Sequence, residues 1–319
     1  MKKIKWGIVG PGRIAHQFAS DIKFSKYGEI TAVASNNKNR ADDFAKQYKI
    51  PSTFYNYSDL YNSPDVDAVY VATPHNFHFK NSSDALNAGK AILCEKPLTV
   101  NPEEAIELFE TAKSNNQYLI EGMWTYFLPA IIKAQEWINE GRIGEVLTVK
   151  SDFGYPKPFD PKSRLFNPEL AGGSLLDMGI YTLAMARLFM KDDPMKIDIF
   201  GHRAPTGADD EVNMLFHYSN SRSASLHTSF RSKLNNHTYI IGEEGYIDIP
   251  DFWRAKSCSL FKVEEKVDEY FDNRKGKGFE FEIDAVSMDI LENRKTSEVI
   301  PPETSIFFQK QMQTILNHF

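Results

Sequence analysis

The residues that most clearly indicate chemistry lie near the start of the chain, in the run Gly10-Pro11-Gly12-Arg13-Ile14-Ala15. A glycine at position 10 lets the chain turn sharply after a strand, and one at position 12 leaves the backbone open to a phosphate. Ala15 stands at the third glycine position and is small enough for a helix to pack closely on a strand. This spacing predicts a site for the pyrophosphate of a dinucleotide at a helix N-terminus, and the alternative is an ordinary strand-to-helix turn.

A second group of polar residues indicates which dinucleotide binds. In such domains an acidic residue at the end of the second strand usually holds the ribose 2′-hydroxyl. Here the run from 35 to 40 has no carboxylate, and Ser35, Asn36, Lys38 and Arg40 take its place. Hydroxyl, amide and cationic groups suit a 2′-phosphate. We therefore predict NADP, with NAD as the alternative and with the two cations as plain solvated residues in that case.

Two further runs follow expected strands, at the sheet edge where open α/β sheets bind ligands. They are Thr73-Pro74-His75-Asn76-Phe77-His78 and Cys94-Glu95-Lys96-Pro97. The His-x-x-His spacing could suit a metal, but catalytic zinc needs three protein ligands and no third is recognisable nearby. We predict no metal here and assign Thr73, Pro74, His75 and His78, with Glu95, Lys96 and Pro97, to packing and cofactor contacts.

The elements that must position these residues alternate between strand and helix patterns over residues 1–122, which predicts a doubly wound parallel sheet, the Rossmann dinucleotide-binding fold. Strands are expected at 4–9, 30–35, 68–72, 91–94 and 118–120, and helices at 14–24, 40–48, 77–88 and 102–113.

The pattern changes after Trp124, and residues 123–319 are predicted to form an α+β domain on a mostly antiparallel open sheet. Strands are expected at 146–153, 196–201, 212–218, 224–230, 239–241 and 246–249, and helices at 130–140, 174–190, 285–292 and 303–316. The strand at 212–218 places apolar residues on both faces, so one sheet face is expected to support a homodimer or a larger oligomer.

Composition bounds the function classes. The 319 residues, 42% hydrophobic and 25% charged, suggest two globular domains. A net charge of −6 argues against a nucleic-acid partner. The two cysteines are too few for a disulfide framework. With no leader and no apolar run near the roughly 18 residues that span a bilayer, a cytoplasmic protein without a membrane partner is expected.

Together with these runs, Gly172-Gly173-Ser174-Leu175-Leu176-Asp177-Met178-Gly179-Ile180-Tyr181 gives the chain a resemblance to the glucose-fructose oxidoreductase, inositol dehydrogenase and rhizopine-catabolism (Gfo/Idh/MocA) family over essentially its whole length. Within it, residues 121–129 and Tyr181 look most like the branch of dihydrodiol dehydrogenases and NADP-dependent D-xylose 1-dehydrogenases. Many relatives carry histidine where Tyr181 stands, which moves the chain away from the inositol branch. NADP-using relatives often carry arginine where Asn36 stands.

The resemblance implies hydride transfer between nicotinamide and a ring carbinol of a pentose, hexose or trans-diol, which needs a proton acceptor. Tyr181 and Lys96 are the candidates, and which of them takes the proton stays open. A phenol titrates at about 10, and a nearby ammonium lowers a pKa by about one to three units. Asp177, four residues before Tyr181, is expected on the same helix face. Its charge would oppose a phenolate unless it is paired with Lys96 or occupied by a substrate hydroxyl.

Trp124, Phe153 and Tyr155 are candidates for the substrate site, because flat aromatic faces suit a sugar or diol ring. Trp124 is equally a candidate for the core between the domains, and core packing is the favoured role of Phe153 and Tyr155. We expect the motifs to converge between the two halves. Several functional readings stay open. The chain is expected to be a sugar or trans-diol dehydrogenase. The alternatives are an oxidoreductase for a different sugar, amino sugar or polyol such as an inositol, and a non-catalytic NADP(H)-binding sensor on the same fold.

Overall fold

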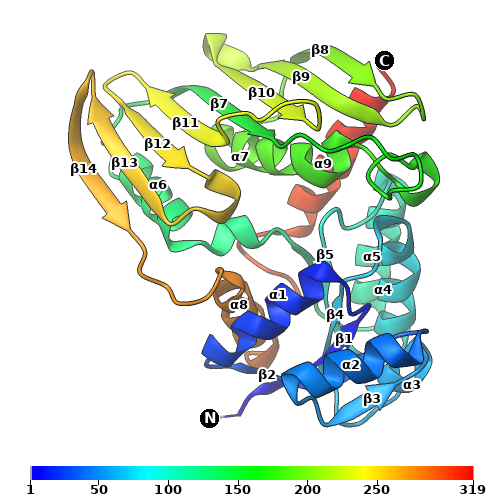
Figure 1. Ribbon diagram of the computed structural model, residues 1–319. Coiled ribbons are helices and arrows are strands. Elements are labelled where there is room, and N and C mark those ends of the chain that lie inside the picture. The colour runs from blue at the N-terminus through cyan, green and yellow to red at the C-terminus, as the bar shows by residue number, and fades with distance from the viewer. Residues whose placement is uncertain (1, 319) are drawn as a thin grey trace. The chain divides into compact units, whose positions relative to one another are not determined.

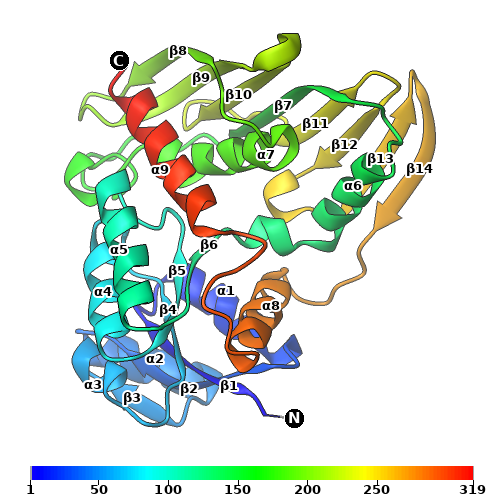
Figure 2. The same ribbon diagram turned by 180° about the vertical axis from the view of Figure 1, so that it is seen from behind.

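The computed structural model describes residues 2–318, which fold into two compact units. Unit 1 comprises Met1–Trp124 and Arg274–Gln309, and unit 2 comprises Thr125–Asn273 and Lys310–Phe319. Figures 1 and 2 show their elements from opposite sides. Each unit is built on its own β-sheet.

Unit 1 contains the predicted parallel sheet, with strand order β3-β2-β1-β4-β5-β6. Its strands pair in parallel throughout. The order reverses beside β1, which creates the switch point at which open α/β sheets bind ligands. The strands are β1 (Ile4–Val9), β2 (Gly28–Ala34), β3 (Ser52–Phe54), β4 (Ala68–Val71), β5 (Ala91–Glu95) and β6 (Leu119–Gly122).

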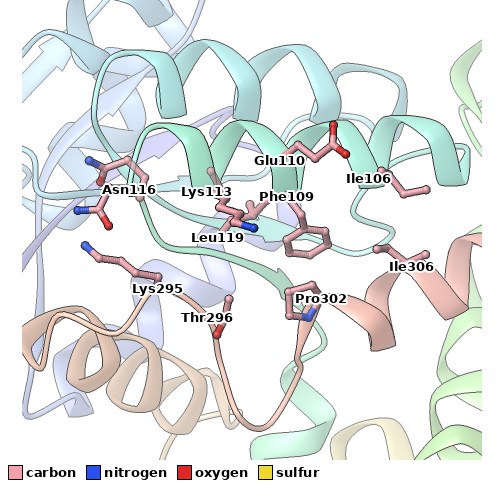
Figure 3. Close-up of a pocket in the computed structure, with 12 residues that line it drawn as sticks. Ile106, Phe109, Glu110, Lys113, Asn116, Leu119, Lys295, Thr296, Pro302 and Ile306 are labelled. Carbon is pink, nitrogen blue, oxygen red and sulfur yellow. The ribbon is translucent and has the colours of Figure 1, made fainter.

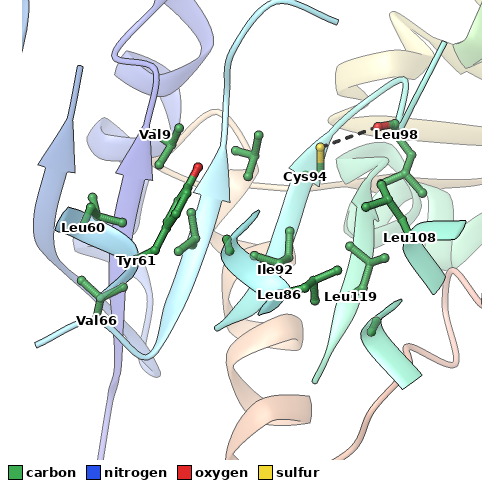
Figure 4. Packing of buried hydrophobic residues seen from close by; sticks show 14 of the residues in the cluster. Val9, Leu60, Tyr61, Val66, Leu86, Ile92, Cys94, Leu98, Leu108 and Leu119 are labelled. Atoms are coloured by element: carbon green, nitrogen blue, oxygen red, sulfur yellow. Dashed lines mark hydrogen bonds between the residues drawn. The ribbon is translucent and has the colours of Figure 1, made fainter. Parts of the chain in front are cut away.

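Helices supply the apolar partners of both sheet faces. One face packs in a core cluster with residues of α3 (Tyr57–Tyr61), α4 (His78–Asn87) and α5 (Pro102–Ser114), in which Leu60, Leu86 and Leu108 are fully buried (Figure 4). Elsewhere in the unit lie α1 (Arg13–Asp21), α2 (Lys38–Tyr48) and α8 (Phe279–Leu291). Near-continuous burial of β4 and β5 is what a parallel sheet covered on both faces requires.

The predicted domain boundary lies between residues 122 and 123, whereas unit 1 runs to Trp124 and also includes the distant segment Arg274–Gln309. The Asp21 carboxylate at the end of α1 accepts hydrogen bonds from three successive main-chain amides, 277 to 279, and so caps the N-terminus of α8. Trp6 Nε1 donates to Ser287 Oγ at 3.1 Å. These contacts join residues more than 250 positions apart, which a local pattern does not reveal.

Unit 2 contains the predicted mostly antiparallel sheet, in the order β14-β13-β12-β11-β7-β10-β9-β8. Its one parallel pairing among the described strands joins β7 to β10. The strands are β7 (Val146–Gly154), β8 (Lys196–Arg203), β9 (Asp209–His217), β10 (Ser223–Ser229), β11 (His237–Gly242), β12 (Tyr246–Pro250), β13 (Ser257–Lys262) and β14 (Glu265–Phe271). The main helices of this part are α6 (Pro129–Asn139) and α7 (Ile180–Met190), and α9 (Pro302–Leu316) closes the chain.

Several predicted elements differ from the structure. The strands β3, β13 and β14 and the short helix α3 were not predicted. β3 has three half-buried residues and β14 is a largely exposed edge strand, so neither shows an apolar alternation. The helix predicted over 174–190 is in fact a π-helical turn, Leu175–Gly179, followed by α7. Over residues 2–318, no helix has both the length and the apolar character needed to cross a bilayer.

Candidate functional site

The glycine turn after β1 has the geometry of a phosphate cradle. Gly10 has a φ of +85°, and a Cβ there would lie 2.9 Å from the Thr73 side chain. Gly12 precedes α1, whose N-terminus has no side-chain cap and no acidic residue in its first turn. A Cβ on Gly12 would meet nothing closer than 3.9 Å, so the space in front of the turn is open. Open space facing unpaired helix amides fits a dinucleotide pyrophosphate.

The other predicted residues of this turn lie at its sides. Pro11 is buried, Ile14 is half-buried and Arg13 is exposed. The Gly12 amide donates to the Gly10 carbonyl at 2.7 Å, which keeps the turn tight.

The residues after β2 form a polar, exposed platform. Asn37 Oδ1 accepts from the Arg40 amide at 3.1 Å and caps α2, while buried Ser35 accepts from the Asn37 amide at 3.2 Å. Asn36, Lys38 and Arg40 are exposed. No carboxylate ends β2, so these groups fit a ribose 2′-phosphate.

Lys38 belongs to a small network that the sequence analysis missed. Its Nζ donates to the Tyr55 hydroxyl at 2.6 Å and lies 3.3 Å from an Asp42 carboxylate oxygen. The Tyr55 hydroxyl also donates to Asp42 at 3.0 Å. Hydrogen bonding to Tyr55 and Asp42 raises the pKa of Lys38, so the ammonium stays charged. The i,i+4 spacing of Lys38 and Asp42 was a usable signal, whereas Tyr55 comes from the segment after β3.

The run after β4 is tied down by His78. This ring is fully buried, with Nε2 2.8 Å from the Thr73 carbonyl and Nδ1 2.7 Å from the Pro97 carbonyl. His78 therefore connects the run after β4 to the run after β5. Thr73 and His75 are also largely buried, and Thr73 Oγ1 accepts from Asn81 Nδ2 at 3.1 Å. Pro74 caps the short helical turn that begins at His75.

The Glu95-Lys96-Pro97 run lies beside buried carboxyl groups. Glu95 is buried, accepts a hydrogen bond from the Tyr70 hydroxyl and has its pKa raised by burial. Lys96 is half-buried, and the Lys96–Pro97 peptide bond is cis. On the neighbouring strand Glu121 is fully buried, and one of its oxygens accepts from the Leu98 amide at 2.7 Å. Burial raises the pKa of Glu121 to about 7.

In unit 2, the double glycine before the π-helical turn is required by close contacts. A Cβ on Gly172 would lie 2.5 Å from the Arg164 carbonyl oxygen, and one on Gly173, at φ +137°, would lie 2.1 Å from Asp209 Oδ1. Buried Asp209 accepts from Ser174 Oγ at 2.8 Å and from the Leu175 amide at 2.7 Å. Asp209, which the sequence analysis missed, therefore caps the helical segment that carries Asp177 and Tyr181.

Asp177 lies in the π-helical turn and accepts from Arg164 Nη2 at 2.9 Å. The Arg164 guanidinium therefore balances the Asp177 charge. Arg164 was not among the partners expected from the sequence. The i,i+4 argument that placed Asp177 and Tyr181 on one face assumed a regular α-helix, and the wider π turn changes that angular relation.

Tyr181 is buried among aromatic rings. Its ring meets Phe153 edge to face at 5.6 Å, and Phe153 contacts Tyr155 edge to face at 6.0 Å. Trp253, absent from the predicted set, stacks on Phe153 at 5.2 Å. Two predicted substrate residues thus lie with Tyr181 in unit 2. The third, Trp124, belongs to unit 1, where its buried ring stacks on Phe279 at 4.6 Å.

Lys96 belongs to unit 1, and Asp177 and Tyr181 belong to unit 2. Over residues 2–318, no three His, Cys, Asp or Glu side chains are grouped as a metal ion would need. A groove of about 380 Å³ lies in unit 1 between α5 and the 295–306 segment, and Phe109, Lys113 and Ile306 are among its lining residues (Figure 3). None of the predicted site residues lines it.

Comparison with known families and proteins gives consistent matches. Residues 4–123 match the sequence model described as "Oxidoreductase family, NAD-binding Rossmann fold", and residues 131–248 match "GFO/IDH/MocA C-terminal domain". The chain is similar to trans-1,2-dihydrobenzene-1,2-diol dehydrogenase of Mus musculus, with 35% identity over 78% of this chain and 75% of that one. The Bos taurus enzyme of the same name is 32% identical over 93% and 91%.

Solved structures agree in fold. Aldose-aldose oxidoreductase from Caulobacter crescentus, complexed with glycerol, superposes with a TM-score of 0.91 at 24% identity and covers 99% of this chain and 97% of that one. Levoglucosan dehydrogenase, complexed with NADH and levoglucosan, gives 0.86 at 20% identity over 99% and 97%.

Proposed function

Because this chain belongs to the GFO/IDH/MocA family of oxidoreductases, we propose that it is an NADP-dependent dehydrogenase for a ring hydroxyl of a trans-diol or a sugar. The observation that carries the proposal is the open space in front of Gly12, at a helix N-terminus with no side-chain cap. The relatives named trans-1,2-dihydrobenzene-1,2-diol dehydrogenase, 30–35% identical, support the substrate class.

The cofactor contacts follow from chemistry. The main-chain amides of Arg13 and Ile14, at the N-terminus of α1, would hold the pyrophosphate, while Gly10, Pro11 and Gly12 shape the turn that leaves room for it. Ser35, Asn36, Lys38 and Arg40 would hold the 2′-phosphate through hydroxyl, amide and cationic groups, with NAD as the weaker alternative. Bound NADP supplies a hydride acceptor at nicotinamide C4.

The proton chemistry is assigned to Lys96 and Tyr181. A hydroxyl that loses hydride from its carbon must lose its proton, and one of these two side chains accepts it. An ammonium at Lys96 would lower the pKa of a neighbouring phenol. The Arg164 guanidinium offsets the Asp177 charge, so Asp177 can accept a substrate hydroxyl hydrogen bond without strongly opposing a phenolate. Phe153 and Tyr155, with Trp253, would contact the apolar face of the ring.

The test is NADP⁺ reduction with a panel of cyclic trans-diols, pentoses, hexoses and inositols, beside NAD⁺. Turnover should favour NADP⁺ and fall at least about 100-fold in Lys96→Ala and Tyr181→Phe, because acid–base catalysis contributes about that much. NADPH binding, followed by fluorescence, should change little in either variant. Full activity in Lys96→Ala would remove Lys96 from the mechanism. Tight NADPH binding with no turnover on any substrate would support a non-catalytic sensor instead.

We also propose a homodimer or larger oligomer formed through the outer face of the unit 2 sheet. Phe200 on β8 is 76% exposed and Leu215 on β9 is 39% exposed, and both lie on the face opposite the buried Met214. Exposed apolar residues gathered on one sheet face favour protein–protein contact. A cytoplasmic location is proposed from the two cysteines, Cys94 and Cys258, which are buried and unpaired with each other.

A further inference from the structure

Glu121 is a buried carboxyl group placed against the segment that carries Lys96. It lies on β6, opposite Cys94 of β5, and its exposed fraction is 0%. One carboxyl oxygen accepts from the Leu98 amide at 2.7 Å. The other, Oε2, has no hydrogen-bond partner within residues 2–318. A buried carboxyl is costly to ionise, so its contacts with the segment after β5 decide what it can do.

The hydrogen bond fixes the chain two residues beyond Lys96. Leu98 is itself fully buried in the core cluster, and its carbonyl lies 3.9 Å from the Cys94 sulfur, as the dashed line in Figure 4 marks. Glu121 and Cys94 thus hold the Leu98 peptide from both sides. A Lys96 side chain rooted in a segment held this way has little backbone freedom.

The polar groups near Glu121 come from three segments, which are the run 94–96 at the end of β5, α8 and α9. Burial raises the pKa of Glu121, the Lys96 ammonium lowers it and the Glu95 carboxylate raises it. Cys94 faces it from β5, and Glu282 of α8 acts on Glu95. Interaction with the buried Ser305 hydroxyl, on α9, and with the Leu98 amide also lowers the pKa of Glu121. Of the charged side chains that act on Glu121, Lys96 is positive and Glu95 is negative. An ionised Glu121 is therefore attracted to the Lys96 ammonium.

We propose that Glu121 is a positioning residue, which holds the Lys96–Leu98 segment in place and whose negative charge favours the protonated form of Lys96. The inference rests on the proposed role of Lys96 in proton transfer. A carboxylate near an ammonium favours the protonated lysine, and a neutral carboxyl removes that bias. The two groups therefore titrate as a coupled pair, and the pair belongs to the proton-transfer machinery.

Glu95 and Glu282 are weaker candidates for this role. Glu95 is engaged by the Tyr70 hydroxyl. Glu282 is fully buried on α8, its pKa is raised well above the ordinary value by burial, and its named charged neighbour is Glu95. Glu95 also bonds the main chain of Lys96, whereas Glu121 is the one of the three that accepts from the Leu98 amide within residues 2–318.

The test measures Lys96 directly, in the cofactor-free full-length protein. Lysine side chains labelled with ¹⁵N are titrated by NMR, and Lys96→Ala identifies the Lys96 signal. In Glu121→Gln, which keeps an oxygen for the Leu98 amide, the Lys96 titration should move down by at least about one pH unit. Glu107→Gln makes the same charge change at an exposed position of α5 and should leave it unchanged.

A kinetic readout accompanies the titration. The pH profile of kcat/KM for alcohol oxidation should contain one ionisation near neutrality fewer in Glu121→Gln, while the KM for cofactor stays within about twofold. Glu121→Asp, which keeps the charge, should restore the wild-type profile and stands in if the glutamine variant does not fold. A Lys96 titration identical in wild type and a folded Glu121→Gln variant would overturn the inference. If the titration moves but Lys96→Ala keeps full activity, the Glu121–Lys96 coupling stands and the proposed function of Lys96 fails.

Discussion

At the scale of single residues, the glycine run illustrates how the same residue type serves two purposes. Gly10 is required by the protein itself, because its positive φ and the nearby Thr73 side chain exclude a Cβ. Gly12 is not: its φ of −93° is ordinary and a Cβ there would meet no protein atom closer than 3.9 Å. The absence of a side chain at Gly12 is therefore what the proposed phosphate site would require.

We expect Gly12→Ala to fold normally and to bind NADPH at least about tenfold more weakly, because its methyl group would occupy the space for the pyrophosphate. Thermal unfolding and NADPH fluorescence measure the two effects separately. Gly10→Ala is the comparison variant and should lower the unfolding temperature as well. Unchanged NADPH affinity in Gly12→Ala would contradict a phosphate site at this turn.

Glu121 makes stability depend on pH. Its folded pKa, about 7, lies above the ordinary value of 4.5, so folding favours the protonated carboxyl. The cost of ionising it in the folded state is absent below about pH 4.5, grows as pH rises through the folded pKa and is constant above it. Glu121→Gln removes this cost.

The Glu121→Gln variant should therefore gain stability relative to wild type as pH rises from 5 to 8, by at most about 3 kcal/mol for a shift of about two and a half units. Urea unfolding at both pH values measures the difference. Glu107→Gln, at an exposed site, should show no such trend. A constant difference between Glu121→Gln and wild type across this range would contradict the burial argument.

At the scale of elements, the helical segment that carries Asp177 and Tyr181 depends on Asp209, a residue of strand β9. Asp209 at the start of β9 accepts two hydrogen bonds from its first turn, and Gly173 leaves the room that Asp209 needs. The motif Gly172-Gly173-Ser174 is therefore one half of a capping arrangement whose other half lies 35 residues further along the chain.

Asp209→Ala should lower the free energy of unfolding by about 2 kcal/mol or more, because it leaves the Leu175 amide and the Ser174 hydroxyl without their acceptor. It should also lower kcat, since the segment that carries Tyr181 loses its anchor. Asp209→Asn keeps one acceptor oxygen and should lose less. Urea unfolding and steady-state kinetics report the two effects, and wild-type stability in Asp209→Ala would show that the cap is dispensable.

At the scale of the whole molecule, each of the two units is built on its own β-sheet. Unit 1 includes the distant segment Arg274–Gln309, which contributes α8. In unit 2, Phe200 at one end of the sheet order and Phe271 at the other are 76% and 60% exposed. Monomeric proteins seldom expose large apolar patches without a use for them.

If this face forms the proposed dimer, Phe200→Ser should weaken self-association at least about tenfold, which sedimentation velocity at micromolar concentrations measures. Val263→Ser changes a residue that is 84% exposed, in the turn between β13 and β14, and serves as the control. A wild-type protein that sediments as a monomer at these concentrations would exclude the dimer.

The sequence alone determined the features that arise from local spacing. The glycine turn between β1 and α1, the alternation of strands and helices in the first 122 residues and the change to a mostly antiparallel sheet all rest on patterns within a few turns of chain. The family resemblance rested on motifs of the same kind.

Only the tertiary structure decided the contacts that join distant residues. Arg164 pairs with Asp177, Asp209 caps the segment before Tyr181, and Glu121 holds the Leu98 amide. The return of α8 to unit 1 likewise depends on Asp21, more than 250 residues away. Burial and hydrogen bonding set the charge state of such groups, and both depend on which segments meet in the fold, which no local pattern encodes.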